Sequence, residues 1–214
     1  MKKDKIILFD LDGTLIDSTE AILESFKVAF ESFALKAPDD EVIKSLVGHP
    51  LDDMFVSMGV DSAYVDQYVK AYKNHYRKIS NQKTVLLPEA KEAVELADTI
   101  AYLGVVTTKT SKYSKELLKH LGLMEYFDVL IGREDVINPK PNPEPILKAL
   151  AKLPKVTGGI WMIGDTCMDM EAASASNIDG IALLCGYANR QSLEKCSHNI
   201  AKNAFEAIQK ITLL

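Results

Sequence analysis

Short, unbroken apolar runs recur along the chain, and each is closed by glycine, proline or polar residues. Such runs are too short for buried helices, and they lack the alternation of a half-buried strand. They therefore predict strands that are covered on both faces, as in a parallel sheet. The predicted strands are residues 6–9, 103–106, 129–131, 160–163 and 181–184.

Helical spacing of apolar residues fills the intervals between the later strands. The predicted helices are residues 89–97, 111–121, 143–151, 168–176 and 204–211. Strands and helices thus alternate from residue 88 onward, which is typical of an α/β fold. We expect a doubly wound, Rossmann-like parallel sheet.

A long stretch without strand candidates separates the first strand from the others. Residues 17–87 show amphipathic helical spacing that is interrupted by proline and glycine. The breaks fall at residues 37–40, 48–50 and 59. Four short helices are predicted, which form a small helical domain inserted into a core made of residues 1–16 and 88–214.

Composition narrows the class of protein and of partner. Hydrophobic residues make up 47% and charged residues 26%, which is ordinary for a globular protein and excludes disordered and collagen-like chains. The net charge of −5 argues against nucleic acid or an anionic membrane as the main partner. We expect a monomer or a small homo-oligomer that acts on a small molecule.

The cysteines and the N-terminus bear on localisation. Cys167, Cys185 and Cys196 form no CxxC pair and no zinc-like spacing, which favours a reducing compartment. The apolar run before Asp10 is too short for a signal peptide, and no stretch is long enough to span a membrane. The sequence predicts a cytoplasmic protein.

Two carboxylates, Asp10 and Asp12, follow the first predicted strand. Ligands of open α/β sheets bind at the carboxyl ends of the strands, so both lie at the expected site. Neighbouring carboxylates repel each other unless a cation lies between them, and Mg²⁺ prefers oxygen ligands. A calcium loop is excluded because Leu15 and Ala21 stand where it needs glycine and glutamate. A solvated acidic turn is the alternative.

A second acidic pair follows the strand 160–163. Gly164 allows a tight turn, and Asp165 and Asp169 lie one helical turn apart, so both can face the same crevice. Taken alone, an aspartate at a helix start is commonly just a cap. Together with the first pair, this segment predicts a metal site.

Two further segments could hold an anion. Residues 107–111 form a hydroxyl-rich turn between a strand and a helix, although Ser111 could simply cap that helix. Lys140 lies among alternating prolines, which alone would suit an extended linker. Asn142 and Pro143 instead suit a helix start, so we expect a rigid loop that orients Lys140. A lysine among carboxylates predicts a bound phosphate or phosphoaspartate.

In this order, DLDGT, VVTT, KPNPEP and GDTCMD resemble the four motifs of the haloacid dehalogenase (HAD) superfamily. In finer sequence detail, these motifs are similar to those of the phosphoglycolate phosphatase-like branch, which carries a helical C1-type cap after the first motif. The resemblance implies that Asp10 is the nucleophile and forms an aspartyl-phosphate, and that Asp12 is the general acid and base. It also implies Mg²⁺ as cofactor, held by Asp10, Asp165 and Asp169 and by the backbone of Asp12.

The same resemblance implies the substrate contacts. Thr107 and Lys140 are expected to bind phosphoryl oxygens, with Gly13 and Thr108 beside them, although Thr108 stands where the branch usually has asparagine. His49, between Gly48 and Pro50, matches a loop that faces the substrate in relatives. A surface histidine is the equal alternative for His49.

The function expected from this resemblance is a Mg²⁺-dependent phosphatase that hydrolyses small phosphorylated metabolites, similar to phosphoglycolate phosphatase. An acid at Asp12 distinguishes phosphoester chemistry from dehalogenation in this superfamily. A sugar phosphomutase of the beta-phosphoglucomutase type and a pyrophosphatase of the same superfamily are the alternatives. A non-enzymatic receiver domain is a third, but the order of the motifs and the large helical insert argue against it.

Overall fold

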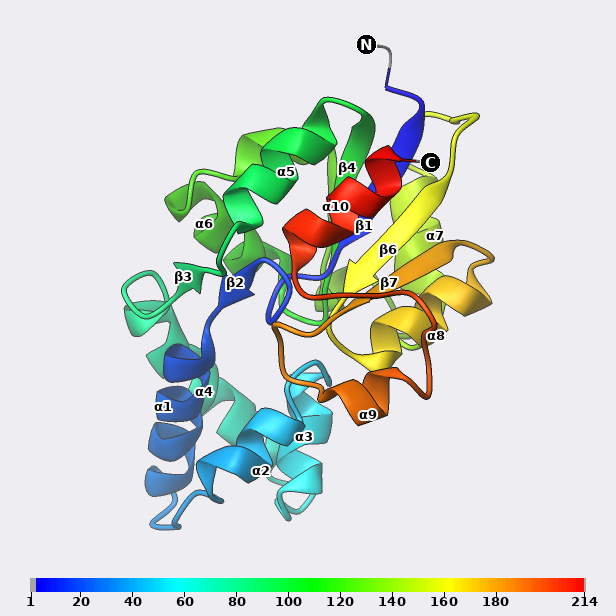
Figure 1. Ribbon diagram of the computed structural model, residues 1–214. Coiled ribbons are helices and arrows are strands. Elements are labelled where there is room, and N and C mark those ends of the chain that lie inside the picture. Colours follow the sequence, from blue (N-terminus) through cyan, green and yellow to red (C-terminus); the bar gives the residue numbers. More distant parts are fainter. Residues whose placement is uncertain (1–2, 214) are drawn as a thin grey trace.

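The computed structural model describes residues 3–213, and a six-stranded parallel sheet forms its centre (Figure 1). The strand order is β5-β4-β1-β6-β7-β8. The bounds are β1 Lys5–Phe9, β4 Ala101–Val106, β5 Val129–Ile131, β6 Ile160–Gly164, β7 Asp179–Leu183 and β8 Ile200–Ala201. The first strand lies between β4 and β6, so the chain winds outward to both sides. The predicted doubly wound α/β fold is confirmed.

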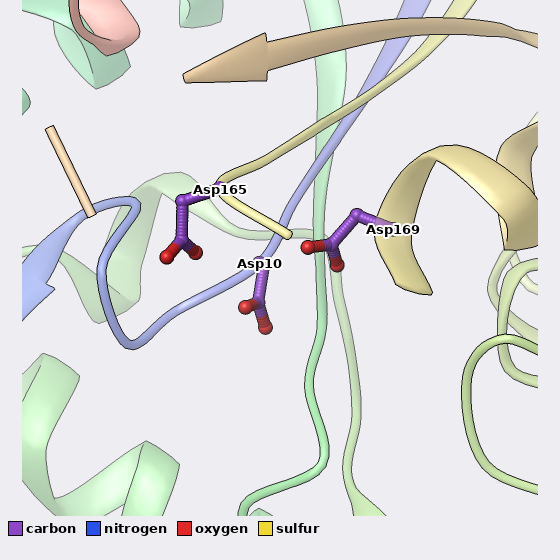
Figure 2. A group of neighbouring side chains, drawn as sticks. All are labelled: Asp10, Asp165 and Asp169. Atoms are coloured by element: carbon purple, nitrogen blue, oxygen red, sulfur yellow. The ribbon is translucent and has the colours of Figure 1, made fainter. Parts of the chain in front are cut away.

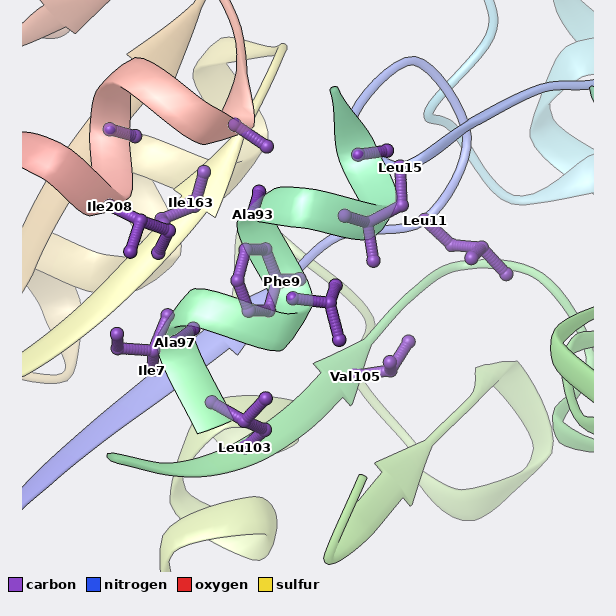
Figure 3. Packing of buried hydrophobic residues seen from close by; sticks show 14 of the residues in the cluster. Ile7, Phe9, Leu11, Leu15, Ala93, Ala97, Leu103, Val105, Ile163 and Ile208 are labelled. Atoms are coloured by element: carbon purple, nitrogen blue, oxygen red, sulfur yellow. The ribbon is translucent and has the colours of Figure 1, made fainter. Parts of the chain in front are cut away.

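Helices cover both faces of the sheet. They are α5 Ala90–Asp98, α6 Ser111–His120, α7 Glu144–Leu150, α8 Cys167–Ala175, α9 Arg190–Leu193 and α10 Ala204–Thr212, with short 3₁₀ turns at Met124–Tyr126 and Arg133–Asp135. Ile7 and Phe9 pack with α5, α6 and α10 on one face, as Figure 3 shows in part. Ile6 and Leu8 pack with α7 and α8 on the other. Burial on both faces explains the unbroken apolar run of β1.

The helical insert, residues 17–87, contains four helices with a separate aromatic core. They are α1 Thr19–Glu31, α2 Asp40–Ser45, α3 Leu51–Ser57 and α4 Val65–Ile79. The ring of Phe26 lies 4.9 Å from that of Phe55 and 4.8 Å from that of Tyr72, measured between centroids. Four helices were predicted, but α1 and α4 are not short, with 13 and 15 residues.

Two short strands join the insert to the sheet domain, and the sequence did not predict them. The pair is β2 Ile16–Asp17 and β3 Val85–Leu86, which run antiparallel where the chain enters and leaves the insert. The expectation of no strand within 17–87 was therefore wrong at its two ends. Strands of two residues are too short to show a periodic pattern. The two-residue strand β8 was missed for the same reason.

A disulfide joins Cys167 at the start of α8 to Cys196 just after α9, while Cys185 is free. The spacing of the cysteines did not predict this pair. Disulfides are uncommon in reducing compartments, so the pair does not support the interpretation of a reducing environment. Localisation stays a prediction. None of the helices in residues 3–213 combines the length and the apolar character that crossing a membrane requires.

Candidate active site

Three aspartates converge at the carboxyl edge of the sheet (Figure 2). Asp10 follows β1, Asp165 follows β6, and Asp169 lies in the first turn of α8. One carboxylate oxygen of each lies within 4.8 Å of the others, and all three side chains are buried. Parallel pairing of β1 with β6 causes this meeting, because Phe9 is in register with Ile163 and both strands end at the same edge.

Backbone and hydroxyl donors fix two of these carboxylates. Asp165 accepts hydrogen bonds from the Tyr187 backbone N–H at 2.8 Å and from the Thr14 hydroxyl at 3.2 Å. Asp169 accepts two from Thr166, at 3.1 Å from its backbone N–H and 2.7 Å from its hydroxyl. The site is thus built from segments that are far apart in the sequence.

Glycine allows the backbone to approach the aspartates closely. Gly13 has φ +78°, and a Cβ at this position would collide with the carboxyl group of Asp165. A Cβ at Gly164 would likewise collide with Asp169. Gly13 therefore lets the backbone pass close to the carboxylates, because it adopts a positive φ and has no side chain.

Lys140 supplies a buried positive charge to this cluster. Its Nζ lies 2.9 Å from Asp10 Oδ1 and 2.5 Å from Asp169 Oδ1, and it donates to the Val106 carbonyl at 3.0 Å. The Asn142 side chain accepts from the Glu144 backbone N–H at 2.9 Å just before α7, although Pro143 stands at the cap position that was predicted for Asn142. Lys140 is therefore oriented between two aspartates.

Burial and neighbouring charges shift the pKa values of the cluster. Burial raises the pKa of Asp10 to about 7, against the opposing effect of Lys140 and with a further increase from Asp169. Burial, Asp10 and Asp169 together raise the pKa of Asp165 well above its usual range. Asp10 and Asp169 raise the pKa of Lys140 despite burial, so the lysine stays charged. Three buried carboxylates against one ammonium suit a hard divalent cation, and this donor set fits Mg²⁺.

The side chain of Asp12 lies outside this cluster. Its Oδ1 accepts a hydrogen bond from the Ser18 hydroxyl, and its Oδ2 lies 3.1 Å from Lys109 Nζ. The expected metal contact of Asp12 was through its backbone, so this side-chain position leaves that prediction untested. The carboxylate instead borders a cavity between the sheet and the insert.

Lys109 is a partly buried cation, with 11% of its side chain exposed, that the sequence analysis did not single out. It donates to the Tyr76 hydroxyl at 3.1 Å and lies 4.6 Å from the centroid of the same ring. Burial opposes its charge, but Asp12, Tyr76 and Tyr72 outweigh burial and raise its pKa well above the usual value. Its place next to the two threonines of the hydroxyl-rich turn was the signal that could have identified it.

The remaining predicted substrate contacts lie in different surroundings. Thr107 is buried at the end of β4, and its hydroxyl accepts from the Lys109 backbone N–H at 3.2 Å. Thr108 donates to the Gly48 carbonyl at 2.8 Å and so ties the sheet edge to the insert. His49 is exposed at the border of the cavity. Thr107 thus lies at the sheet edge, Thr108 contacts the insert, and His49 belongs to the insert itself.

The cavity measures about 100 Å³. Asp12, Thr108 and Lys109 line it from the sheet edge, and Gly48 and Tyr76 line it from the insert. Its size suits a group of a few atoms. Asp12, which lines this cavity, is two residues from Asp10 in the chain.

The fold and this edge define an α/β enzyme whose acidic site lies outside the carboxyl ends of its strands. The chain belongs to the haloacid dehalogenase-like hydrolase family, whose model matches residues 7–183. The chain is therefore a hydrolase, as the sequence motifs predicted. This membership decides against the receiver-domain alternative.

Known relatives carry phosphatase names. A pyrophosphatase from Halalkalibacterium halodurans is 32% identical over 185 residues, which are 86% of this chain and 84% of the relative. A phosphoglycolate phosphatase from Yersinia pseudotuberculosis is 29% identical over 188 residues, 85% and 81% of the two chains. A haloacid dehalogenase-like family hydrolase from Streptococcus pneumoniae has a TM-score of 0.85 at 26% identity and covers 96% and 97%. The prediction of an enzyme of the phosphatase type is confirmed.

Proposed function

We propose that this protein is a Mg²⁺-dependent phosphatase that hydrolyses small phosphomonoesters, similar to phosphoglycolate phosphatase, through an aspartyl-phosphate on Asp10. The observation that carries the proposal is the position of the Asp10 carboxylate. It lies among two further buried aspartates and 2.9 Å from Lys140 Nζ. This combination serves a nucleophile that must approach an anionic phosphoryl group.

In the first step an oxygen of Asp10 attacks phosphorus, and the bond from phosphorus to the leaving-group oxygen breaks. Asp12 donates a proton to that oxygen. In the second step Asp12 takes a proton from water, the water oxygen attacks phosphorus, and the bond to Asp10 breaks to release phosphate. The hydrogen bond from Ser18 to Oδ1 and the contact of Lys109 with Oδ2 orient the Asp12 carboxyl group for both steps.

Asp10, Asp165 and Asp169 would hold the Mg²⁺, together with the backbone of Asp12. When bound, the ion supplies charge neutralisation at the phosphoryl oxygens. Lys140 adds a fixed positive charge at the same place, and Thr107 would donate to a phosphoryl oxygen, with Gly13 and Thr108 beside it. Positioning and charge neutralisation carry most of the catalysis in phosphoryl transfer.

We further propose that residues 17–87 act as a cap over a core of residues 1–16 and 88–214, with His49 near the leaving group. The small cavity under this insert supports a small phosphorylated metabolite as substrate. Pyrophosphate hydrolysis is a second candidate. The cationic residues of the cavity favour it, as does the 32% identical relative that is named a pyrophosphatase.

The test is a phosphate-release screen over small phosphomonoesters and pyrophosphate, with Mg²⁺ and with excess chelator. We expect turnover of phosphoglycolate or a close analogue that chelator abolishes. Added methanol tests the covalent step, because a common aspartyl-phosphate transfers its phosphoryl group to methanol and to water in one ratio for every substrate. Ratios that differ between substrates would refute the intermediate, and undiminished turnover in chelator would refute the metal.

A further inference from the structure

The cavity under the insert carries more positive than negative side chains. Lys73, Lys109 and Arg133 line it, against the carboxylates of Asp12 and Asp52. Lys109 is already paired with Asp12, and Asp52 is exposed, so solvent screens its charge. The excess positive charge of the cavity therefore comes mainly from Arg133 and Lys73.

Only part of the hydrogen-bonding capacity of the Arg133 side chain is satisfied within the protein. Its Nη1 donates to the Val136 carbonyl at 3.2 Å, whereas its Nε is buried and has no hydrogen-bond partner. Within residues 3–213, no carboxylate lies within 4.0 Å of its guanidinium group. The positive charge of Arg133 therefore borders the cavity without a carboxylate to neutralise it, which favours an anion in the cavity.

Glu134 and Asp135 follow Arg133 in the chain but do not neutralise it, because both accept hydrogen bonds from Ser111 at the start of α6. Glu134 accepts from the Ser111 backbone N–H at 2.8 Å. Asp135 accepts from the Gly132 backbone N–H at 2.8 Å and from the Ser111 hydroxyl. These hydrogen bonds direct both carboxylates away from the guanidinium group.

Backbone pairing fixes Arg133 relative to the catalytic edge. Its N–H donates to the Lys109 carbonyl at 3.0 Å, and β4 and β5 are in register just before them, with Val106 opposite Ile131. Arg133 and Lys109 therefore project from adjoining strand ends into one cavity. Lys109 contacts Asp12, which lies beside the proposed nucleophile, so Arg133 stands on the leaving-group side of the site.

We infer that Arg133 binds a second anionic group, a carboxylate or a phosphate, on the leaving group of the substrate. This inference rests on the proposed function and narrows it to doubly anionic substrates. The planar N–H groups along one edge of a guanidinium group bind two oxygens of an oxyanion at once. Lys109 adds positive charge on the same side of the cavity. The two relatives described above are named for phosphoglycolate and pyrophosphate, which both carry a second anionic group.

Matched substrates test the inference. Phosphoglycolate and 2-hydroxyethyl phosphate differ only by a carboxylate in place of a CH₂OH group. We expect wild type to prefer phosphoglycolate, and Arg133→Met to lower that preference in kcat/KM by about 10- to 100-fold. The loss should appear in KM for phosphoglycolate, while 2-hydroxyethyl phosphate is turned over almost as before. Arg133→Lys should keep part of the preference, because it keeps the charge but loses the two-oxygen edge.

Arg190→Met is the matched control, since it removes the same charge from an exposed site on α9 and should leave the preference unchanged. An equal loss for both substrates in Arg133→Met, or a wild type without preference, would overturn the inference.

A binding measurement separates this inference from the proposed function. By calorimetry, 3-phosphonopropionate should bind wild type more tightly than propylphosphonate does, and Arg133→Met should remove the difference. If no phosphomonoester were hydrolysed but this difference persisted, the proposed function would fail and the anion site would stand. If hydrolysis occurred and Arg133→Met left the difference intact, the anion site would fail and the function would stand.

Discussion

The sheet edge and the cavity beneath the insert use their charges in opposite ways. At the edge, the buried Lys140 contacts both Asp10 and Asp169, and three buried carboxylates share its one positive charge. In the cavity, Arg133 has no carboxylate within 4.0 Å among residues 3–213. The edge therefore lacks positive charge and suits a cation, whereas the cavity lacks negative charge and suits an anion. From this difference we infer that the edge carries out the chemistry and that the cavity selects the substrate.

Removal of the buried lysine should have the largest effect, and it should not discriminate between substrates. We expect Lys140→Met to lower kcat/KM by about 10²- to 10³-fold for phosphoglycolate and 2-hydroxyethyl phosphate alike. Stability should fall by about 3–5 kcal/mol, because Asp169 is left buried without its partner. Steady-state kinetics and denaturant unfolding measure both effects.

Adding Asp169→Asn to Lys140→Met is the control for stability, since it removes the unpaired charge and should restore part of the loss. A loss of kcat/KM for only one of the two substrates would contradict this account, because it would mean that the sheet edge determines substrate specificity.

Mg²⁺ should stabilise the protein more at high pH than at low pH. Burial raises the pKa of Asp10 from 3.8 to about 7, so the folded metal-free protein binds a proton that the unfolded chain releases. Its stability should therefore fall as pH rises from about 4 to about 7. Mg²⁺ needs the ionised carboxylates, and at about 100 times its Kd it would add about 2.7 kcal/mol.

Calorimetric melting at about pH 5 and about pH 8, with and without Mg²⁺, measures this difference. Asp10→Asn should weaken the pH dependence of metal-free stability. A Mg²⁺ effect that is equal or larger at the lower pH would contradict the assignment of the ion to these carboxylates.

The sequence predicted the sheet edge well because each of its motifs is local. Asp10 and Asp165 each follow an apolar run, and the end of a strand is set by its own residues. Parallel pairing then brings these ends together without further information. Lys140 was also predictable, because the surrounding prolines and Asn142 make its loop rigid.

The cavity could not be predicted in the same way, because its features depend on contacts between distant segments. The pairing of Lys109 with Asp12 joins two strand ends, and the free donor of Arg133 depends on where Glu134 and Asp135 are bound. The disulfide between Cys167 and Cys196 depends on how α9 packs near α8. None of these contacts leaves a pattern in the local sequence.

Thr108 should affect both regions modestly, because it joins them. Thr108→Val removes the 2.8 Å hydrogen bond to the Gly48 carbonyl. One such bond contributes about 0.5–1.5 kcal/mol, so we expect kcat/KM to fall by about 3- to 10-fold for both matched substrates. Thr108→Ser keeps the hydroxyl and is the control. A loss confined to phosphoglycolate would instead support the direct substrate contact that the sequence predicted.

His49 should have the smallest effect, since it is exposed at the border of the cavity. We expect His49→Ala to change the ratio of kcat/KM for phosphoglycolate to that for an aryl phosphate by about two- to fivefold, as exposed contacts contribute little. Competition between the two substrates in one reaction measures this ratio directly. An unchanged ratio would make His49 a surface histidine.

The division between edge and cavity rests on Asp10 as the residue that carries the phosphoryl group. The direct measurement is an acid-quenched single turnover of phosphoglycolate, followed by mass spectrometry of the peptide that contains residues 6–27. Fragmentation distinguishes Asp10 from Asp12 within that peptide. We predict the added mass of one phosphoryl group on Asp10 in wild type and none in Asp10→Asn. A phosphoryl group on another residue, or turnover by Asp10→Asn at a rate close to that of wild type, would contradict the account.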